Sequence, residues 1–165
     1  MIFLTVGTQF PFDRLVRAVD QIIGEGAISE TVFGQIGHSA YKPVNFEAVV
    51  RMEKDAFDKC FREASGIIGH AGMGTISMAL SGHKPLLAMP RLRKYGEVVN
   101  NHQLGIAKMF SERGYILAAY GVEDLPDGVR RLADFVPAER RTAPNAVANR
   151  ISRFLSTLQG GLGED

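Results

Sequence analysis

The segment at residues 69–75, Gly-His-Ala-Gly-Met-Gly-Thr, combines residue types that can bind an anion. It lies between a short apolar run and a helical stretch, and its glycines allow the backbone to turn sharply and approach a ligand. The free N–H groups at the start of that helix, together with the helix dipole, suit phosphate. The Thr75 hydroxyl can cap the helix or bind a phosphate oxygen. An ordinary strand-to-helix turn with a Thr cap explains the spacing equally well, so both interpretations stay open.

Two known phosphate-binding motifs do not fit this segment. Gly72 and Gly74 supply the first two glycines of a dinucleotide fingerprint, but Ser77 occupies the third position. The next strand ends in Met89-Pro90 and brings no acidic residue for a ribose, and no Gly-Lys-Ser/Thr of a P-loop follows. The residues therefore argue against NAD binding and against a P-loop.

Two further polar segments follow predicted strands. Glu97 precedes the run Asn100-Asn101-His102-Gln103, whose amide and imidazole groups suit sugar hydroxyls. By itself this run is better explained as a polar helix start capped by Asn101. Residues 7–9, Gly-Thr-Gln, can hold phosphate or close a cleft, and an ordinary loop is equally compatible with them. Because ligands collect at the carboxyl ends of parallel strands, residues 70–75 and 90–103 are expected to face one crevice.

The elements that must position these residues alternate along the chain. Short apolar runs predict strands at 2–6, 31–36, 44–50, 66–69, 86–89 and 115–118. Helical spacing of apolar residues predicts helices at 12–23, 53–64 and 75–82, one ending near 112, and two more at 122–135 and 144–158. The alternation predicts an α/β fold with a doubly wound, mostly parallel sheet. One domain is expected over 1–159, followed by a flexible tail at 160–165.

Composition narrows the classes of protein. The chain is 45% apolar and 22% charged, so it can bury a core, and its net charge of +1 gives no global signature of nucleic-acid binding. The single cysteine, Cys60, excludes an internal disulfide and is expected to pack in the core. No apolar run approaches the roughly 20 residues of a membrane span, and the first residues lack the basic head of a signal peptide. We therefore expect a cytoplasmic protein.

The stretch from His70 to Gln103 resembles the C-terminal, donor-binding domain of family-28 glycosyltransferases. The common features are His-Ala-Gly-x-Gly-Thr, Lys-Pro before a strand, Pro-Arg after it, and Gly-Glu followed later by His-Gln. The opening Val-Gly-Thr-Gln also fits. The chain is most similar to small bacterial exopolysaccharide subunits of the PssE type, which are similar to the catalytic subunit of the eukaryotic two-part N-acetylglucosamine transferase.

The resemblance implies a Rossmann-like half of a GT-B glycosyltransferase that binds a UDP-sugar. It also implies inverting transfer of a hexose to a lipid-linked saccharide acceptor in exopolysaccharide biosynthesis, without a metal or another cofactor. The acceptor would be recruited by a separate, membrane-anchored glycosyltransferase subunit. The chain itself would lie peripherally at the cytoplasmic membrane face, bound through that partner.

The resemblance also assigns roles to residues. Gly72, Met73, Gly74 and Thr75 would surround the diphosphate, Arg91 would offset its charge, and Glu97, His102 and Gln103 would contact the donor sugar or ribose. The predicted substrate-binding set is completed by Gly7, Thr8, Gln9 and His70. The general base is not assigned, and its candidates are the partner, His70 and His38, although His38 is better explained as a surface residue.

One departure from the family pattern supports a different function. Many members carry an acidic residue four positions after the second glycine of the motif, where it holds the ribose, and this chain has Met78 there. Ribose recognition must then use another group, such as Glu97, or be weaker. The alternatives are a non-catalytic subunit that enhances or stabilises a separate transferase and a nucleotide-binding regulatory module. The helix expected at 144–158 either docks on a partner or, more commonly for such an apolar stripe, packs in the core.

Overall fold

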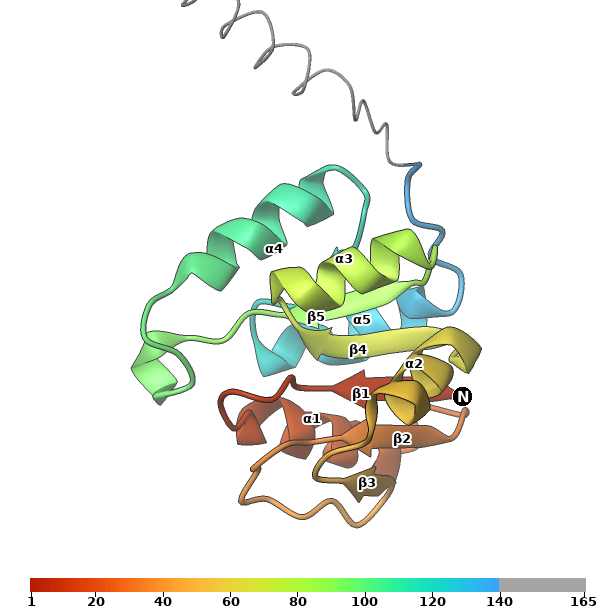
Figure 1. Ribbon diagram of the computed structural model, residues 1–165, viewed down its shortest axis with the longest axis vertical. Coiled ribbons are helices and arrows are strands. Elements are labelled where there is room, and N and C mark those ends of the chain that lie inside the picture. Colours follow the sequence, from red (N-terminus) through yellow and green to blue (C-terminus); the bar gives the residue numbers. More distant parts are fainter. Residues whose placement is uncertain (140–165) are drawn as a thin grey trace, which may run out of the picture.

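A computed structural model describes residues 1–139 of the chain as an α/β unit built on one parallel sheet (Figure 1). The strands lie in the order β3-β2-β1-β4-β5-β6, and every neighbouring pair is parallel. Their bounds are Ile2–Thr5 for β1, Val32–Gln35 for β2, Glu47–Val49 for β3, Gly66–His70 for β4, Leu86–Met89 for β5 and Leu117–Ala118 for β6. The predicted α/β class with a doubly wound sheet is confirmed. The strand order reverses between β1 and β4, which creates a switch point where ligands commonly bind.

Helices cover both faces of the sheet. The helices α1 (Asp13–Gly24) and α5 (Leu125–Leu132) pack on one face, whereas α2 (Lys54–Glu63), α3 (Met73–Ser81) and α4 (His102–Glu112) pack on the other. Two short 3-10 helices, η1 (Arg93–Tyr95) and η2 (Val122–Asp124), interrupt the loops before α4 and α5. No helix among the described residues is long and apolar enough to cross a bilayer.

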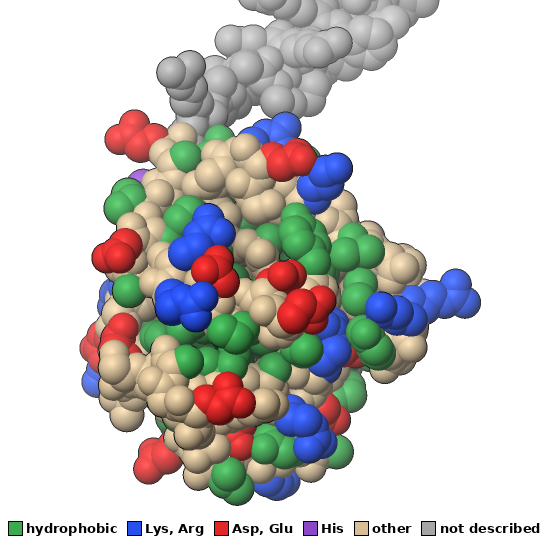
Figure 2. All heavy atoms as spheres, turned by 180° about the vertical axis from the view of Figure 1, so that it is seen from behind, with side chains coloured by type: hydrophobic (Ala, Val, Ile, Leu, Met, Phe, Trp, Pro, Cys, Tyr) green, Lys and Arg blue, Asp and Glu red, His purple; other side chains and the backbone are tan. Residues whose placement is uncertain are grey.

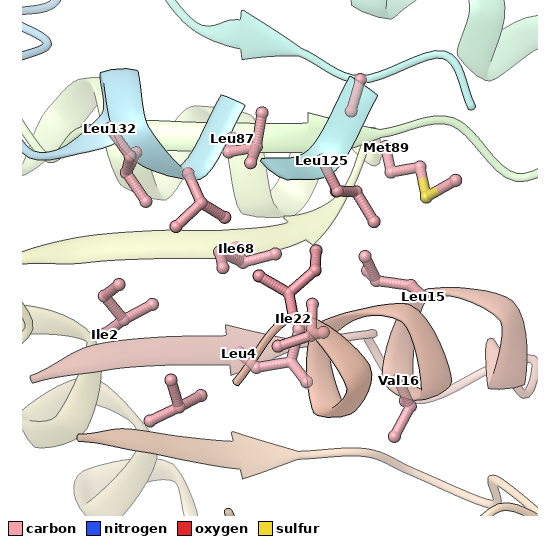
Figure 3. Packing of buried hydrophobic residues seen from close by; sticks show 14 of the residues in the cluster. Ile2, Leu4, Leu15, Val16, Ile22, Ile68, Leu87, Met89, Leu125 and Leu132 are labelled. Atoms are coloured by element: carbon pink, nitrogen blue, oxygen red, sulfur yellow. The ribbon is translucent and has the colours of Figure 1, made fainter. Parts of the chain in front are cut away.

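The core consists of two layers because side chains alternate across each strand. Ile2 and Leu4 of β1 join Ile68, Leu87 and the apolar sides of α1 and α5 (Figure 3). Phe3 points to the other face, where it contacts Phe57 edge-on with ring centroids 5.4 Å apart. Cys60 is partly buried against this second layer, in agreement with its predicted packing role.

Several boundaries differ from those predicted. The strands expected at 44–50 and 115–118 shrink to Glu47–Val49 and Leu117–Ala118. The helix expected at 122–135 is divided into η2 and α5. Pro126 has no N–H to donate within a continuous helix, but it is tolerated in the first turn of a new one, where the missing N–H costs nothing. The helix expected at 144–158 and the tail at 160–165 lie outside the described residues, so the proposed domain boundary stays a prediction.

The face covered by α1 and α5 carries charges of both signs. Viewed from behind, acidic, basic and hydrophobic side chains are interspersed, and neither sign gathers over this side (Figure 2). Such mixing fits a chain whose net charge is +1. The uneven charge that matters for ligand binding lies at the carboxyl ends of the strands.

Candidate functional site

A cavity of about 690 Å³ opens at the carboxyl ends of β1, β2, β4 and β5, across the switch point. Its walls come from the loops after β1, β3 and β5, from the end of β4, and from the first turns of α2, α3 and α4. All predicted site residues except Glu97 line it: Gly7, Thr8, Gln9, His70, Gly72, Met73, Gly74, Thr75, Arg91, His102 and Gln103. The parallel topology thus brings together three segments that are far apart in the sequence.

The start of α3 supplies unpaired N–H groups to the cavity. Gly72 occupies the N-cap position and no side chain caps the helix; the Ile76 N–H donates to the Gly72 carbonyl at 3.0 Å. The N–H groups of residues 73–75 precede this bond and have no helical acceptor. Of the two interpretations of Thr75, the helix cap is excluded, because α3 begins two residues earlier than expected and Thr75 is its third residue. Gly74 faces open space, since an added Cβ would meet nothing within 4 Å.

The His70 ring fills a slot between two glycines. A Cβ at Gly72 would lie 2.2 Å from Nε2 of His70, and one at Gly7 would lie 2.9 Å from Cε1. Gly7 also has a φ of +75°, a left-handed conformation that favours glycine. Burial and the nearby Arg91 charge lower the pKa of His70 to about 4, although a backbone hydrogen bond with Thr5 acts in the opposite direction. The imidazole is therefore neutral at pH 7.

Positive charge dominates the cavity wall. Among the described residues, Arg51, Lys54 and Arg91 line it, and no Asp or Glu does. Sequence reasoning missed Arg51 and Lys54, although both follow β3 and the rule on carboxyl ends of parallel strands could have found them. Met78 also lines the cavity, so no carboxylate replaces the acidic residue expected there.

Arg91 is buried and mainly holds loops together. Its terminal nitrogens donate to the carbonyls of Val6 and Pro11, and also to those of Phe10 at 2.8 Å and Glu97 at 3.5 Å. Its pKa is lowered to about 10 by burial, opposed by Glu97, so it stays charged at pH 7. Arg91 can offset phosphate charge at a distance, but both of its terminal nitrogens already bond backbone carbonyls.

Glu97 lies apart from the other predicted site residues. It is 6% exposed and does not line the cavity. Its Oε1 and Oε2 accept from Nε and Nη2 of Arg14, each at 2.8 Å, and Oε2 also accepts from the Leu92 N–H at 2.9 Å. A direct contact with a sugar or ribose would require these bonds to break. Glu97 bridges Arg14 and the Leu92 backbone in this structure, and its contact with a donor stays a prediction.

The start of α4 presents two polar side chains to the cavity. Oε1 of Gln103 accepts from the Arg91 N–H at 3.1 Å, and Nδ1 of His102 bonds Oδ1 of Asn100. These contacts use one end of each side chain, so Nε2 of either remains for a ligand. Asn101 occupies the N-cap position of α4, but its Oδ1 accepts from the Arg93 N–H at 2.8 Å, so its side chain does not cap the helix.

Neither a second base candidate nor a metal site adds to this cavity. His38 is exposed and outside the lining, as its surface interpretation predicted. Within residues 1–139 no group of three or more His, Cys, Asp or Glu could hold a metal ion. Metal independence of the chain stays a prediction.

Fold and cavity together define a Rossmann-like domain with an electropositive pocket at its switch point. Residues 1–158 match the glycosyltransferase family 28 C-terminal domain, and the chain belongs to this family. The family resemblance predicted from His70–Gln103 is confirmed.

Curated relatives agree with the family, and solved structures agree with the fold. The chain is 28% identical to the mouse and 29% to the human "UDP-N-acetylglucosamine transferase subunit ALG13", over 69% and 70% of its length. It spans 10% of the length of either relative. A solution structure of ALG13 superposes with a TM-score of 0.60 at 20% identity, covering 87% of this chain and 91% of that one. Os79 from O. sativa in complex with UDP gives 0.59 at 16% identity, covering 81% and 32%. At these identities the structural likeness concerns the fold alone.

Proposed function

We propose that the chain is the nucleotide-sugar-binding subunit of a two-part inverting glycosyltransferase. It takes a hexose from a UDP-sugar and transfers it to a lipid-linked saccharide acceptor in exopolysaccharide biosynthesis. The UDP-sugar is its donor substrate, and no metal or other cofactor takes part. The observation that carries the proposal is the cavity in which the uncapped start of α3 meets Arg51, Lys54 and Arg91, with no Asp or Glu of residues 1–139 in its lining.

These features suit a diphosphate. Unpaired N–H groups at a helix start bind phosphate oxygens directly, and the helix dipole adds favourable potential. Gly74 leaves space for close approach of the ligand to the backbone. The volume of about 690 Å³ falls within the range of small-molecule sites. His102 and Gln103 also line the pocket, and their Nε2 atoms suit the hydroxyls of the sugar.

The geometry of the cavity suits the negative charge that develops on the leaving diphosphate during transfer. An acceptor hydroxyl attacks the anomeric carbon, the bond from that carbon to the UDP oxygen breaks, and the leaving diphosphate gains negative charge. The N–H groups of α3 and the nearby Arg91 charge stabilise it. The acceptor proton needs a base, and His70 is poorly suited because its pKa of about 4 makes it a weak one at pH 7. We therefore place the base in the partner subunit.

A partner is part of the proposal for two reasons. The curated relatives are named as subunits, and this chain spans 10% of their length. The cavity that the described residues form is assigned to the donor in this proposal, which leaves the lipid-linked saccharide to a second subunit. A membrane-anchored, acceptor-binding subunit would complete the enzyme and hold this chain at the cytoplasmic face of the membrane.

One observation favours a second function. Met78 lies in the cavity wall where many family members carry a carboxylate, and Glu97 is committed to Arg14. Because no carboxylate of the described residues lines the wall, ribose hydroxyls lose a strong acceptor there. A non-catalytic subunit that enhances or stabilises a separate transferase would tolerate this loss.

Calorimetric titration of the full chain with UDP, with NAD as the control ligand, tests the donor site. Gly74→Asp supplies the sharpest variant, because the site is open and a carboxylate at a helix start favours folding while repelling phosphate. Gly74→Asn is its neutral match. We expect UDP but not NAD to bind the wild type, Asp to abolish binding, and Asn to retain part of it. Equal UDP binding by the Asp variant and the wild type would contradict this site.

Transfer by the chain reconstituted with its partner separates the two functions. A catalytic subunit makes transfer sensitive to Gly74→Asp. A helper subunit supports transfer by the other protein equally well with either Gly74 variant.

A further inference from the structure

The segment between β5 and α4 carries much of the cavity wall but little regular structure. It runs from Pro90 to Asn101, contains only the short η1, and leads into His102 and Gln103. Side chains whose orientation matters for a ligand must be held within a narrow range by surrounding contacts. The backbone hydrogen bonds of this loop are local, from Tyr95 and Glu97 to the Leu92 carbonyl and from Gly96 to the Arg93 carbonyl. Its orientation on the domain must therefore come from side chains.

A buried ion pair anchors this loop to α1. Arg14 and Glu97, 83 residues apart in sequence, are joined by two bonds of 2.8 Å, and their side chains are 16% and 7% exposed. Nη2 of Arg14 also donates to the Pro90 carbonyl at 3.0 Å. The guanidinium lies 4.7 Å from the centroid of the Tyr95 ring. Arg14 thus contacts the start, the 3-10 turn and the carboxylate of the same loop.

Glu97, the second member of the pair, contacts the backbone of its own loop and is linked through Arg91 to the loop after β1. Oε2 of Glu97 accepts from the Leu92 N–H, and Nη1 of Arg91 lies 3.5 Å from the Glu97 carbonyl. Arg91 in turn donates to carbonyls of residues 6, 10 and 11 and has its own N–H bonded to Gln103. The contacts form a continuous chain from Arg14 to the Gln103 side chain.

Stability alone does not explain such a pair. Desolvating two charges offsets much of their attraction, so a buried ion pair is weak evidence of net stabilisation. Two parallel bonds from a guanidinium to a carboxylate do fix relative orientation, because both groups are planar. Every bond of this pair to backbone ends on the loop, at Pro90 and Leu92.

We propose that Arg14 is a positioning residue that, through Glu97, holds the β5–α4 loop in the arrangement that presents His102 and Gln103 to the ligand. The proposal rests on the donor site proposed above. Arg14 does not line the cavity, so it acts without touching the donor.

Amide hydrogen exchange on the full chain tests the loop directly and needs no ligand. Arg14→Ala should speed exchange of the Leu92 and Arg93 amides by about tenfold to a hundredfold, as expected for lost bonds to charged groups. Amides of β4 and β5 should exchange as in the wild type. Arg17→Ala is the matched control, because Arg17 is exposed on the same helix and its guanidinium lies over Tyr41. Equal acceleration in the strands and the loop would show a global effect and overturn the proposal.

Titration with UDP then connects the loop to binding. We expect Arg14→Ala to weaken UDP affinity about tenfold and Arg17→Ala to match the wild type. Arg14→Lys should have an affinity between those of the wild type and Arg14→Ala, because an ammonium group cannot make both bonds to the carboxylate. The Arg14→Ala/Glu97→Ala double variant should bind no worse than Arg14→Ala, because the pair acts as one unit. Additive losses, or a Glu97 variant much weaker than Arg14→Ala, would indicate a direct role for Glu97 and overturn the proposal.

The two proposals fail differently. A wild-type chain that does not bind UDP refutes the donor site, and loop exchange still decides whether Arg14 orders this segment. UDP binding that Arg14→Ala leaves unchanged refutes the positioning role and leaves the donor site intact. In a reconstituted pair the donor KM should rise more than kcat falls, because saturating donor restores the loop.

Discussion

Gly72→Ala probes the slot that holds His70. The added Cβ would stand 2.2 Å from Nε2 and 2.7 Å from Cδ2 of the ring, closer than real Cβ contacts come. The ring is also close to Gly7, where an added Cβ would lie 2.9 Å from Cε1. Gly72 has φ −89° and ψ 141°, which alanine adopts without strain, so contact alone sets the cost. Overpacking of this kind costs about 1–3 kcal/mol.

Gly74→Ala is the matched control, two residues along the same segment. Its Cβ would meet nothing within 4 Å, and it lies in the first turn of α3. Replacing a helical glycine by alanine stabilises by about 0.5–1 kcal/mol. Urea denaturation followed by far-ultraviolet circular dichroism measures both variants. Relative to wild type, the free energy of unfolding should fall for Gly72→Ala and rise slightly for Gly74→Ala.

A double variant identifies the contact responsible. Removing the imidazole removes the steric clash with the new methyl group, so His70→Ala/Gly72→Ala should unfold at the same urea concentration as His70→Ala. A full additional loss in the double variant would show that the backbone at Gly72 matters for another reason. A Gly72→Ala variant as stable as the wild type would refute the slot itself.

Three further predictions concern stability. Burial lowers the pKa of His70 to about 4, so between pH 6.5 and 4 the unfolded state binds more protons than the folded one. The stability that is present above pH 6.5 is therefore lost on acidification, by about 3 kcal/mol. Denaturation at pH 7 and 4.5 should show a smaller loss in His70→Gln than in wild type. Arg91→Met should lower the free energy of unfolding by about 2–4 kcal/mol, since it leaves buried carbonyls unpaired, and calorimetric melting checks this. Gly128→Ala should destabilise by about 1–3 kcal/mol despite better helix propensity, because its Cβ would lie 2.6 Å from Cδ1 of the buried Leu87; urea titration against Gly74→Ala shows the contrast.

The sequence was sufficient for the fold and for the location of the cavity. Short apolar runs and parallel topology place residues 7–9, 70–75 and 90–103 at one edge of the sheet, because strand-to-helix loops share that edge. The same rule applies to Arg51 and Lys54 after β3. The sequence does not single them out, because a basic pair after a short, weakly apolar strand carries little signal by itself.

The spacing of residues in the sequence does not predict the direction in which a side chain points. Glu97 precedes a polar run and reads as a ligand contact, yet its carboxylate turns to Arg14, 83 residues earlier. Arg91 follows a strand at the cavity, but burial directs its guanidinium to carbonyls of the loop after β1. Both outcomes depend on pairings between distant segments, and periodicity within one segment contains no information about them.

The two glycines of the Gly72-Met73-Gly74 motif are accommodated for different physical reasons. Gly72 is required by a neighbouring side chain, because the His70 ring occupies the space of its Cβ, whereas Gly74 borders empty cavity. A substitution at Gly72 therefore reports on packing whatever the ligand, and one at Gly74 reports on the ligand with little effect on the fold. If UDP binding fails in Gly74→Asp while the folded state is at least as stable, the loss belongs to the cavity. A loss at Gly72 does not allow that conclusion, so the second glycine is the position at which the proposed donor site can be tested without disturbing the domain.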